Sequence, residues 1–404
     1  MTLANGRTYL AIPGPSVIPD RVLRAMHRAS PNIYEGELVD MTEGIKRDLA
    51  ALAGTAGDVA LYVGNGHAAW EASLANILSP GDAILVANSG DFAVRWGDIA
   101  RSFGVEVIDL EFGRSAPVNA DEIETALSRD KGHKIKAVMA VQVDTASSVL
   151  NDIGAIRAAM DRAGHPALLL SDNMASMGCE PFDMDGLGVD MTLAGSQKGL
   201  MTPAGVAILW IGPRARAARE AAKCVTPYWD WKPRIMPEIF SDNFYGTAPT
   251  HQLFGLREAL DMIAEEGKDA VFRRHEILAR AVWAAVEKWG QGGKMTLNIQ
   301  NPDWRSHSVT TVKIGSPDGT RLRRFVETNM GVTLGIGLGM STPADPNSDG
   351  TFRIGHMGHV NAHMVLGVLG AIDAGLKALE VPHGNGALEA ASALIAASVP
   401  KAAF

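Results

Sequence analysis

Short apolar runs alternate with amphipathic stretches along residues 45–212. The apolar runs have the length and composition of buried strands, and apolar residues between them recur at helical spacing. We expect helices over His67–Leu78, Phe92–Phe103, Ala120–Leu127 and Ile153–Arg162. We expect strands at Val59–Val63, Ala83–Ala87, Val105–Leu110, Ala137–Val141, Ala167–Ser171, Met191–Ala194 and Val206–Ile211. This alternation predicts an α/β domain with a mostly parallel sheet of these seven strands, covered on both faces.

The alternation stops at residues 225–255, which are rich in Pro, Trp, Asp and Tyr. A loop of this length is usually functional. Helical patterns follow over Leu253–Glu266 and Ala270–Trp289. A second, smaller α/β portion then has strands at His307–Ile314, Val332–Ile336 and Thr351–Ile354, helices at Thr320–Asn329 and Ala362–Leu379, and a Gly/Ala-rich tail, His383–Ala397, that could end in a helix. We expect an N-terminal arm (residues 1–20), a large domain (21–280) and a small C-terminal domain (281–404).

Composition narrows the class of protein. The chain has 404 residues, enough for two or three domains, with 47% hydrophobic and 20% charged residues, as in soluble globular proteins. A net charge of −8 opposes a nucleic-acid surface or a polybasic membrane patch. Cys179 and Cys224 are too few for a disulfide framework and lack the spacing of a zinc site, so we expect free thiols and no metal. No apolar window has the length of a membrane helix or signal peptide, which makes the cytoplasm the expected location.

Two polar residues stand at the ends of two predicted strands. Asp172 closely follows the run Ala167–Leu170, and Lys198 lies just beyond Val189–Leu193. If these strands are neighbours, the carboxylate and the amine emerge at the same edge of the sheet. An enzyme that uses pyridoxal phosphate (PLP) needs such a pair: a lysine to form the Schiff base and an acid to keep the pyridine nitrogen protonated. Each residue alone has an ordinary alternative, as a solvated lysine or a turn-capping aspartate.

A glycine-punctuated turn, Gly64–His67, joins a predicted strand to a predicted helix. Free N–H groups at the helix start and the helix dipole favour an anion, and glycine lets the backbone approach closely. Asn65 and His67 add side-chain donors, so Asn65, Gly66 and His67 fit the phosphate of PLP. A plain strand–turn–helix without a ligand has the same pattern.

Three further residues fit the same cofactor or its substrate. Phe92 follows a strand and would stack on the pyridine ring, although a core phenylalanine at a helix start is equally common. Thr145, after another strand, offers a hydroxyl, although a loop of small polar residues is its simple alternative. Arg353 stands inside an apolar strand, where a guanidinium needs a partner. It suits a substrate carboxylate, the alternative being a structural salt bridge.

The motifs together resemble class V, fold-type I, PLP-dependent aminotransferases, and are most similar to the serine–glyoxylate and alanine–glyoxylate enzymes. The resemblance spans nearly the whole chain, and its most specific part is the lysine segment. The matching segments are Pro13–Ser16, Ile18–Val22, Gly66–His67, Ser79–Asp82, His165–Leu169 before Asp172, Gly195–Met201, Pro203–Gly205, Gly255–Leu260 and Arg353–His356.

The resemblance implies the remaining roles. Gln197 would join Gly66 and His67 at the phosphate, and Thr145 would lie near the ring hydroxyl. In this family the neighbouring subunit completes the site, and Thr247 matches the residue that reaches across to the phosphate. A homodimer is therefore implied, with residues 225–255 at its interface.

Two segments depart from the family pattern. Where serine–glyoxylate enzymes tend to have a His-Arg-Ser-like segment on the substrate side, this chain has Tyr34, Glu35 and Gly36. A carboxylate in place of a cation would change the charge preference of the substrate site. An acid-Thr/Ser-small-Thr-Gly stretch of the family ends here in Ser147 and Ser148, so a glycine is absent. The cofactor residues are complete, whereas the substrate residues, Tyr34 and Glu35 among them, differ.

The sequence therefore predicts a transaminase. It would move an amino group from a small amino acid of the serine or alanine type to glyoxylate or pyruvate in two half-reactions through Lys198. One alternative is a transaminase with another donor, of the aspartate, ureidoglycine or pyridoxamine type. A PLP lyase or desulfurase, with Cys179 or Cys224 as nucleophile, is another. A non-enzymatic PLP-binding regulator is the third.

Overall fold

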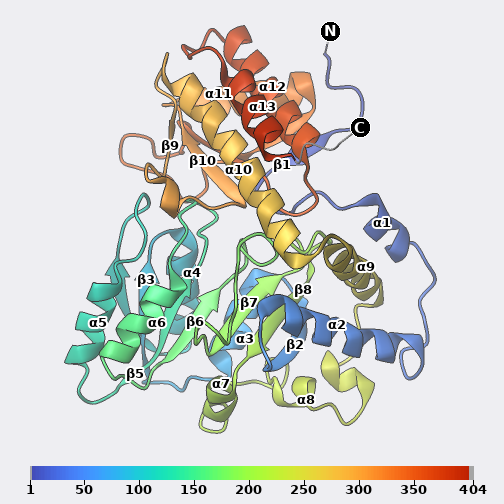
Figure 1. Ribbon diagram of the computed structural model, residues 1–404. Coiled ribbons are helices and arrows are strands. Elements are labelled where there is room, and N and C mark those ends of the chain that lie inside the picture. Colours follow the sequence, from blue (N-terminus) through green and yellow to red (C-terminus); the bar gives the residue numbers. More distant parts are fainter. Residues whose placement is uncertain (1, 400–404) are drawn as a thin grey trace.

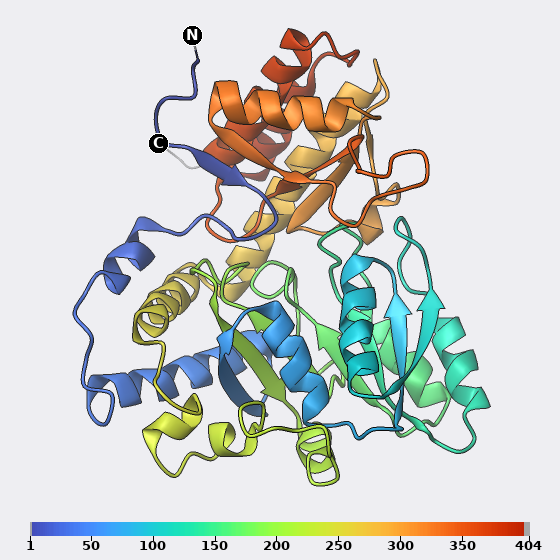
Figure 2. The ribbon, with the colours of Figure 1, turned by 180° about the vertical axis from the view of Figure 1, so that it is seen from behind.

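The computed structural model describes residues 2–399, which form two sheets. Figure 1 shows the larger sheet below and the smaller one above, with the long helix α10 (Lys268–Gly290) running between them. Figure 2 shows the same arrangement from behind, with the N-terminal segment passing along the side of both parts. No helix of residues 2–399 combines the length and the hydropathy needed to cross a bilayer.

The larger sheet has seven strands in the order β2-β8-β7-β6-β5-β3-β4. β8 is antiparallel to both of its neighbours, and all other pairs are parallel, which confirms the mostly parallel sheet. All seven predicted strands are present. Their bounds are β2 Asp58–Gly64, β3 Ala83–Asn88, β4 Glu106–Glu111, β5 Ile135–Val141, β6 Leu168–Asp172, β7 Met191–Gly195 and β8 Gly205–Ile211.

Alternate residues of these strands enter two different apolar cores. Leu85 and Leu169 belong to one core, whereas their neighbours Ile84 and Leu170 belong to the other. This division follows from the two-residue period of a strand, and it explains why the strands read as continuous apolar runs. The four helices predicted between the strands are present, as α3 Gly66–Ala75, α4 Asp91–Ser102, α5 Ala120–Arg129 and α6 Ile153–Arg162.

The smaller sheet has five strands in the order β1-β11-β12-β10-β9. β1 (Tyr9–Ala11) comes from the predicted N-terminal arm and pairs in parallel with β11 (Val332–Ile336). The other elements are β9 Thr296–Leu297, β10 Val309–Lys313, β12 Thr351–Gly355, α11 Asp318–Met330, α12 Ala362–Ala378 and α13 Ala387–Ser398. This sheet has its own core. α10 contributes to both cores, with Val271 in that of the larger sheet and Leu278 in that of the smaller one. The domain limits at residues 20 and 280 stay a prediction.

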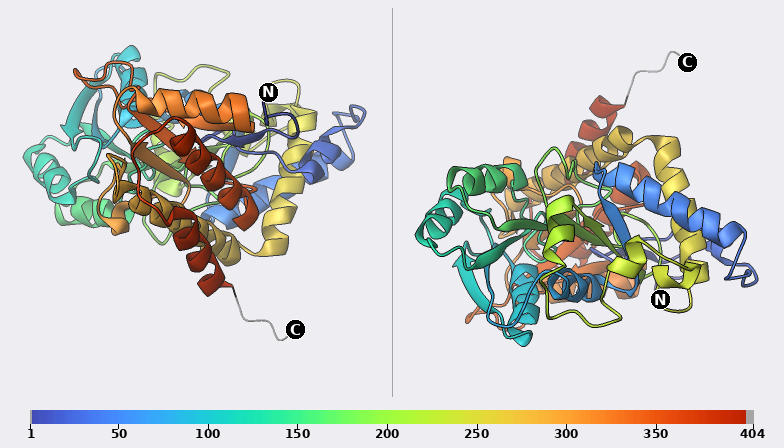
Figure 3. Two further views of the ribbon diagram at one scale, coloured as in Figure 1. Left: turned by 90° about the horizontal axis from the view of Figure 1, so that it is seen from above. Right: turned by 90° about the horizontal axis from the view of Figure 1, so that it is seen from below.

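Several helices were not singled out by the sequence patterns. α2 (Glu37–Ala53) buries Leu38, Ile45 and Leu49 on one face, and α1 (Asp20–Met26) and α7 (Pro213–Ala218) are short. Residues 225–255 are largely irregular, but they contain α8 (Lys232–Ile235), a 3-10 turn (Phe240–Asn243) and the start of α9 (Thr250–Glu266). Figure 3 shows α2 beside this segment, and Lys46 Nζ of α2 donates a hydrogen bond to the Arg234 carbonyl at 2.9 Å.

Candidate active site

Asp172 and Lys198 meet at the carboxyl edge of the larger sheet. β6 ends at Asp172, and β7 is its parallel neighbour, with Asp172 opposite Leu193. Lys198 lies in the turn that follows β7. Burial raises the pKa of Asp172 to about 6. Burial, together with the positive charge of Arg353, lowers the pKa of Lys198 to about 8. The predicted neighbouring of the two strands is thus confirmed.

The N-terminal segment packs directly on Lys198. Lys198 Nζ donates to the Pro13 carbonyl, and Ser16 Oγ donates to the Lys198 carbonyl at 2.7 Å. Gly14, at φ +96°, lies so close that a Cβ there would be 2.6 Å from Lys198 Nζ. Only glycine combines this backbone conformation with so close an approach. The Pro13–Ser16 motif was noted only as part of the family resemblance, so its contact with the lysine was missed.

Two donors hold the Asp172 carboxylate. Met174 N donates to Oδ1 at 2.7 Å, and Trp70 Nε1 donates to Oδ2 at 2.8 Å. Both bonds favour the ionised carboxylate and so oppose the effect of burial on the pKa of Asp172. Trp70 was missed because nothing in its local sequence distinguishes it from a core residue. The only available signal was its position on α3, one helical turn beyond His67.

The start of α3 has the character of an anion site. Asn65 caps the helix by accepting from His67 N at 3.1 Å, and the side chains of Asn65 and His67 are exposed. Gln197 Oε1 is buried and has no hydrogen-bond partner within residues 2–399. Glycines line this end: a Cβ at Gly195 would lie 2.7 Å from Gln197 Oε1, and a Cβ at Gly66 would lie 2.8 Å from Met174 Cε. The start of a helix, with free backbone N–H groups and the exposed Asn65 and His67 side chains beside it, suits a phosphate.

A buried aspartate organises the opposite side of the site. Asp144 accepts hydrogen bonds from the backbone N–H groups of Phe92 at 3.1 Å, Ala146 at 2.9 Å and Ser147 at 2.8 Å. It thereby ties the first turn of α4, which carries Phe92, to the loop that carries Thr145. Burial raises the pKa of Asp144. Asp144 directly precedes the predicted site residue Thr145. Its hydrogen bond to Phe92 N, which spans 52 residues, has no signal in the local sequence.

Arg353 enters this group from the smaller sheet. Its side chain lies in β12, the residue is 5% exposed, and burial lowers its pKa to about 10. Nε donates to the Ile336 carbonyl at 2.7 Å and Nη1 to the Thr145 carbonyl at 2.8 Å. No acidic residue among residues 2–399 forms an ion pair with it. Within the described residues, Arg353 therefore does not form the structural salt bridge that was its alternative role. Its Nη2 stays available for a carboxylate.

Three predicted residues lie apart from this group. Tyr34 and Glu35 are exposed on the segment between α1 and α2. Figures 1 and 2 show this segment at the outer edge of the chain. Tyr34 is 83% exposed, and the Glu35 carboxylate accepts a long hydrogen bond from Asn32 Nδ2 at 3.5 Å. Thr247 is also exposed, and no hydrogen bond of its side chain is found within residues 2–399. The structure of one chain thus brings Lys198, Asp172, Thr145 and Arg353 together, but not these three.

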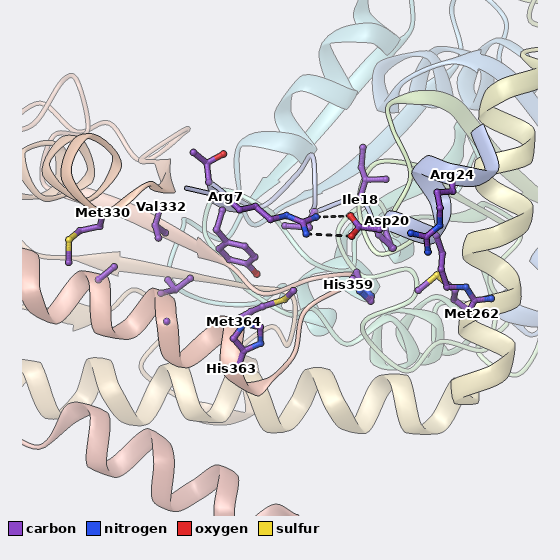
Figure 4. A pocket seen from close by; sticks show the side chains of 18 of the residues that line it. Arg7, Ile18, Asp20, Arg24, Met262, Met330, Val332, His359, His363 and Met364 are labelled. Atoms are coloured by element: carbon purple, nitrogen blue, oxygen red, sulfur yellow. Dashed lines mark hydrogen bonds and ion pairs between the residues drawn. The ribbon is translucent and has the colours of Figure 1, made fainter. Parts of the chain in front are cut away.

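A separate cavity of about 730 Å³ lies between the N-terminal segment and α12 (Figure 4). Arg7 and Asp20 form an ion pair of 2.7 Å at its rim, and Met364 of α12 lines it. None of the predicted site residues lines this cavity. The same N-terminal segment serves the site and this cavity. Pro13 and Ser16 contact Lys198, and Ile18 and Asp20, a few residues later, line the cavity.

The site has a partner for each of three groups of PLP. The Lys198 amine suits the aldehyde, the Asp172 carboxylate suits the ring nitrogen, and the start of α3 suits the phosphate. With the two-sheet fold, it defines a PLP-dependent enzyme of fold type I. Residues 8–362 match the family profile described as Aminotransferase class-V, and the chain belongs to this family. It is a PLP-dependent aminotransferase, as the motifs predicted, and its cofactor is PLP.

The chain is similar to aminotransferases over almost its full length. It is 36% identical to the serine–glyoxylate aminotransferase of Methylorubrum extorquens, over 97% of each chain. It is 35% identical to the L-aspartate–glyoxylate aminotransferase of Paracoccus denitrificans, over 92% of this chain and 91% of that one. Its fold is that of the crystal structure of ureidoglycine–glyoxylate aminotransferase from Bacillus subtilis, with a TM-score of 0.87, 24% identity, and coverage of 98% and 99%.

Proposed function

We propose that this aminotransferase moves the amino group of a small amino acid, of the serine or alanine type, to a small 2-oxo acid, glyoxylate or pyruvate. The observation that carries this proposal is Arg353, a buried guanidinium without an acidic partner in residues 2–399, in the electrostatic field of Lys198. All four of these substrates present a carboxylate to bind. The similarity to two glyoxylate aminotransferases supports the choice of acceptor.

The cofactor roles are part of the proposal. Lys198 would hold the cofactor through its amine, and Asp172 would pair with the ring nitrogen and keep it protonated. Phe92 would stack on the ring, and Thr145 would lie near the ring hydroxyl. The phosphate would be held by Asn65, Gly66, His67 and Gln197. The N-terminal end of α3, where the Asn65 and His67 side chains are exposed, supports this assignment.

The side chains supply binding and proton transfer. When bound, PLP carries the amino group between the two substrates and accepts the electron pair released at the substrate α-carbon. Lys198 takes the proton from that carbon through Nζ and returns it in the second half-reaction. A pKa of about 8 leaves a useful share of the amine neutral near pH 7–8, which a base requires. Asp172, held ionised by Trp70 and Met174, stabilises positive charge on the ring nitrogen.

Arg353 would bind the substrate carboxylate through Nη2. Its other bonds go to two backbone carbonyls, which orient the guanidinium without neutralising it. A charge-assisted bond to a carboxylate in this buried setting gives both affinity and orientation. Both half-reactions use the same grip, since the donor and the acceptor each carry a carboxylate.

We propose that the enzyme works as a homodimer whose site includes Thr247, Tyr34 and Glu35 from the partner. Thr247 lies in a segment with exposed apolar side chains, among them Met236, Ile239 and Tyr245. Exposed apolar side chains near a site are typical of an interface. A Glu35 from the partner would set the charge preference for the donor side chain.

Subunit mixing tests the shared site. Lys198→Ala and Thr247→Arg should each be inactive alone, and co-expression should restore about a quarter of wild-type turnover, because half of the dimers are mixed and carry one intact site. Recovery of no activity in purified mixed dimers would contradict the shared site, and it would leave the transaminase chemistry untouched.

A donor screen tests the substrates. Serine and alanine should convert the bound cofactor to its amine form, seen as a change in visible absorption, and glyoxylate or pyruvate should reverse it. Aspartate is the main competitor, given the Paracoccus relative, and ureidoglycine and pyridoxamine complete the screen. Glu35→Gln should change the donor preference; an unchanged profile would remove Glu35 from the substrate site. Full turnover by Lys198→Ala would overturn the mechanism.

Desulfurase chemistry is not supported by the thiols. Cys179 is fully buried, and burial raises its pKa to about 12, so it is a protonated thiol at neutral pH. Burial also raises the pKa of Cys224. Product analysis separates the two activities, because a desulfurase releases sulfur from cysteine, whereas a transaminase yields an amino acid and an oxo acid.

Both thiols are free, which supports a cytoplasmic location.

A further inference from the structure

The Asp172 carboxylate accepts a hydrogen bond from a buried side chain of α3. Trp70 is 2% exposed, and its indole Nε1 donates to Asp172 Oδ2 at 2.8 Å. Met174 N occupies Oδ1. Because a carboxylate accepts up to about four hydrogen bonds, these two donors leave room for the cofactor ring nitrogen. They also orient the carboxylate before the cofactor arrives.

The indole is itself held by aromatic neighbours. Trp70 stacks on Trp96, with ring centroids 6.5 Å apart and planes at 17°. The His67 ring meets it edge-on at 4.7 Å, and Phe92 lies at 6.1 Å. The residues proposed for the phosphate and for ring stacking thus both contact the indole that holds Asp172. A rotation of the indole would be opposed on several sides, which fixes the direction of its N–H.

The indole shifts the protonation of Asp172 in one direction only. An indole N–H is only a donor, so it bonds well to an ionised carboxylate and cannot accept a hydrogen bond from the O–H of a neutral carboxyl group. It therefore favours the charged form of Asp172 inside a site where burial disfavours it. An ionised Asp172 is the form that can hold a protonated ring nitrogen.

We propose that Trp70 is the positioning residue for Asp172, orienting the carboxylate and holding it ionised for the ring nitrogen of the cofactor. This inference rests on the proposed role of Asp172. Trp96 provides a matched control, because its own Nε1 is buried without a hydrogen-bond partner in residues 2–399. Replacing either indole by phenylalanine removes similar volume, but only Trp70→Phe removes a bond to Asp172.

Equilibrium titration of the apo protein with PLP separates the two roles of an indole, packing and hydrogen bonding. Trp70→Phe should bind PLP about 10- to 100-fold more weakly, the loss expected for a hydrogen bond to a charged group, and its affinity should peak at higher pH. Trp96→Phe keeps the bond to Asp172 and loses only part of the packing around the indole, so it should lose less PLP affinity than Trp70→Phe and keep the pH profile of the wild type. Equal affinities and pH profiles for both variants would overturn the proposal. If Asp172→Asn itself kept full affinity, the assumed role of Asp172 would fail instead.

A measurement on the wild-type protein covers the case in which Trp70→Phe does not fold. The chain has 8 tryptophans, so nitrogen-15 labelling gives a small set of indole N–H signals. One signal of the apo protein should shift with a midpoint near the Asp172 pKa of about 6, and that response should be absent in Asp172→Asn. Lys198 and Asp144 are the other charged groups near Asp172, and the His67 ring meets the indole itself. Lys198 titrates near pH 8, and Asp144→Asn and His67→Gln control for the other two groups. The absence of any such signal would overturn the proposal.

Discussion

Arg353 Nη1 donates a hydrogen bond to the backbone carbonyl of Thr145 at 2.8 Å, across 208 residues of sequence. This bond joins the smaller sheet to the loop that follows β5 in the larger one. It places a site cation that forms no ion pair within residues 2–399 beside the residue proposed to lie near the cofactor ring. One hydrogen bond therefore joins the residue proposed to bind the substrate to the loop proposed to line the cofactor.

Arg353→Lys tests the substrate grip. A lysine amine cannot serve both backbone carbonyls and a substrate carboxylate, so KM for donor and acceptor should rise about 10- to 100-fold, with PLP affinity nearly unchanged. Steady-state kinetics and PLP titration measure the two quantities. Arg305→Lys is the control, because Arg305 is also buried and bonded to the carbonyls of Ile299 and Gln300, but it pairs with Glu287. Equal KM changes in both variants would contradict the assignment.

Lys198→Met should make the apo protein more stable at pH 7. The pKa of Lys198 is lowered to about 8, so below this pH the folded protein carries a buried charge that the unfolded chain solvates. The unfolded chain binds more protons between about pH 8 and 10.4, and wild-type stability therefore rises with pH through this interval.

The stability advantage of Lys198→Met should be about 2 kcal/mol at pH 7 and should shrink towards pH 10. Urea unfolding at fixed protein concentration measures it, with Lys131→Met, on the exposed surface, as the control. An advantage that is constant from pH 7 to pH 10 would show that the charge of Lys198 is not its source.

Gly14→Ala should disable the lysine. The added Cβ would stand 2.6 Å from Lys198 Nζ, and φ is +96°, so either the amine or the N-terminal segment must move. We expect PLP affinity and turnover to fall at least about tenfold, as for other misplaced catalytic groups. Gly6→Ala is a close control, because Gly6 has φ +144° in the same segment but nothing within 4 Å. Comparable losses in both variants would indicate a backbone effect alone.

Ser148 explains the missing family glycine. It adopts φ +64°, a left-handed conformation, while its N–H donates to the Asp144 carbonyl at 2.8 Å and its Oγ accepts from Thr311 N at 3.1 Å. Both Ser148→Gly and Ser148→Ala lose the side-chain bond, but only glycine removes the strain. The glycine variant should therefore be about 1 kcal/mol more stable than the alanine variant.

Thermal or urea unfolding measures this order at Ser148. At Thr125, exposed in the middle of α5, the same pair of substitutions should give the opposite order, with alanine more stable by about 1 kcal/mol. If the alanine variant were the more stable one at both positions, the backbone of Ser148 would not be strained.

The periodicity of the chain determined the framework of this protein. All seven strands of the larger sheet and the helices between them follow from local patterns, because a two-faced sheet needs continuous apolar runs. The positions of Asp172 and Lys198 followed too, since parallel neighbouring strands end at one edge. The cofactor and the aminotransferase family could be predicted from the motifs at these strand ends.

Only the tertiary structure decided how these residues are supported. The bond from Trp70 to Asp172 spans 102 residues, and that from Ser16 to Lys198 spans 182. Such contacts depend on how helices and loops pack on the sheet, and packing has no local signature in the sequence. Tyr34, Glu35 and Thr247 lie exposed and apart from the site within one chain, which no local pattern indicated. The strand ends follow from the local pattern. The burial that lowers the pKa of Lys198 and the long-range hydrogen bond from Trp70 that favours an ionised Asp172 depend on the tertiary structure.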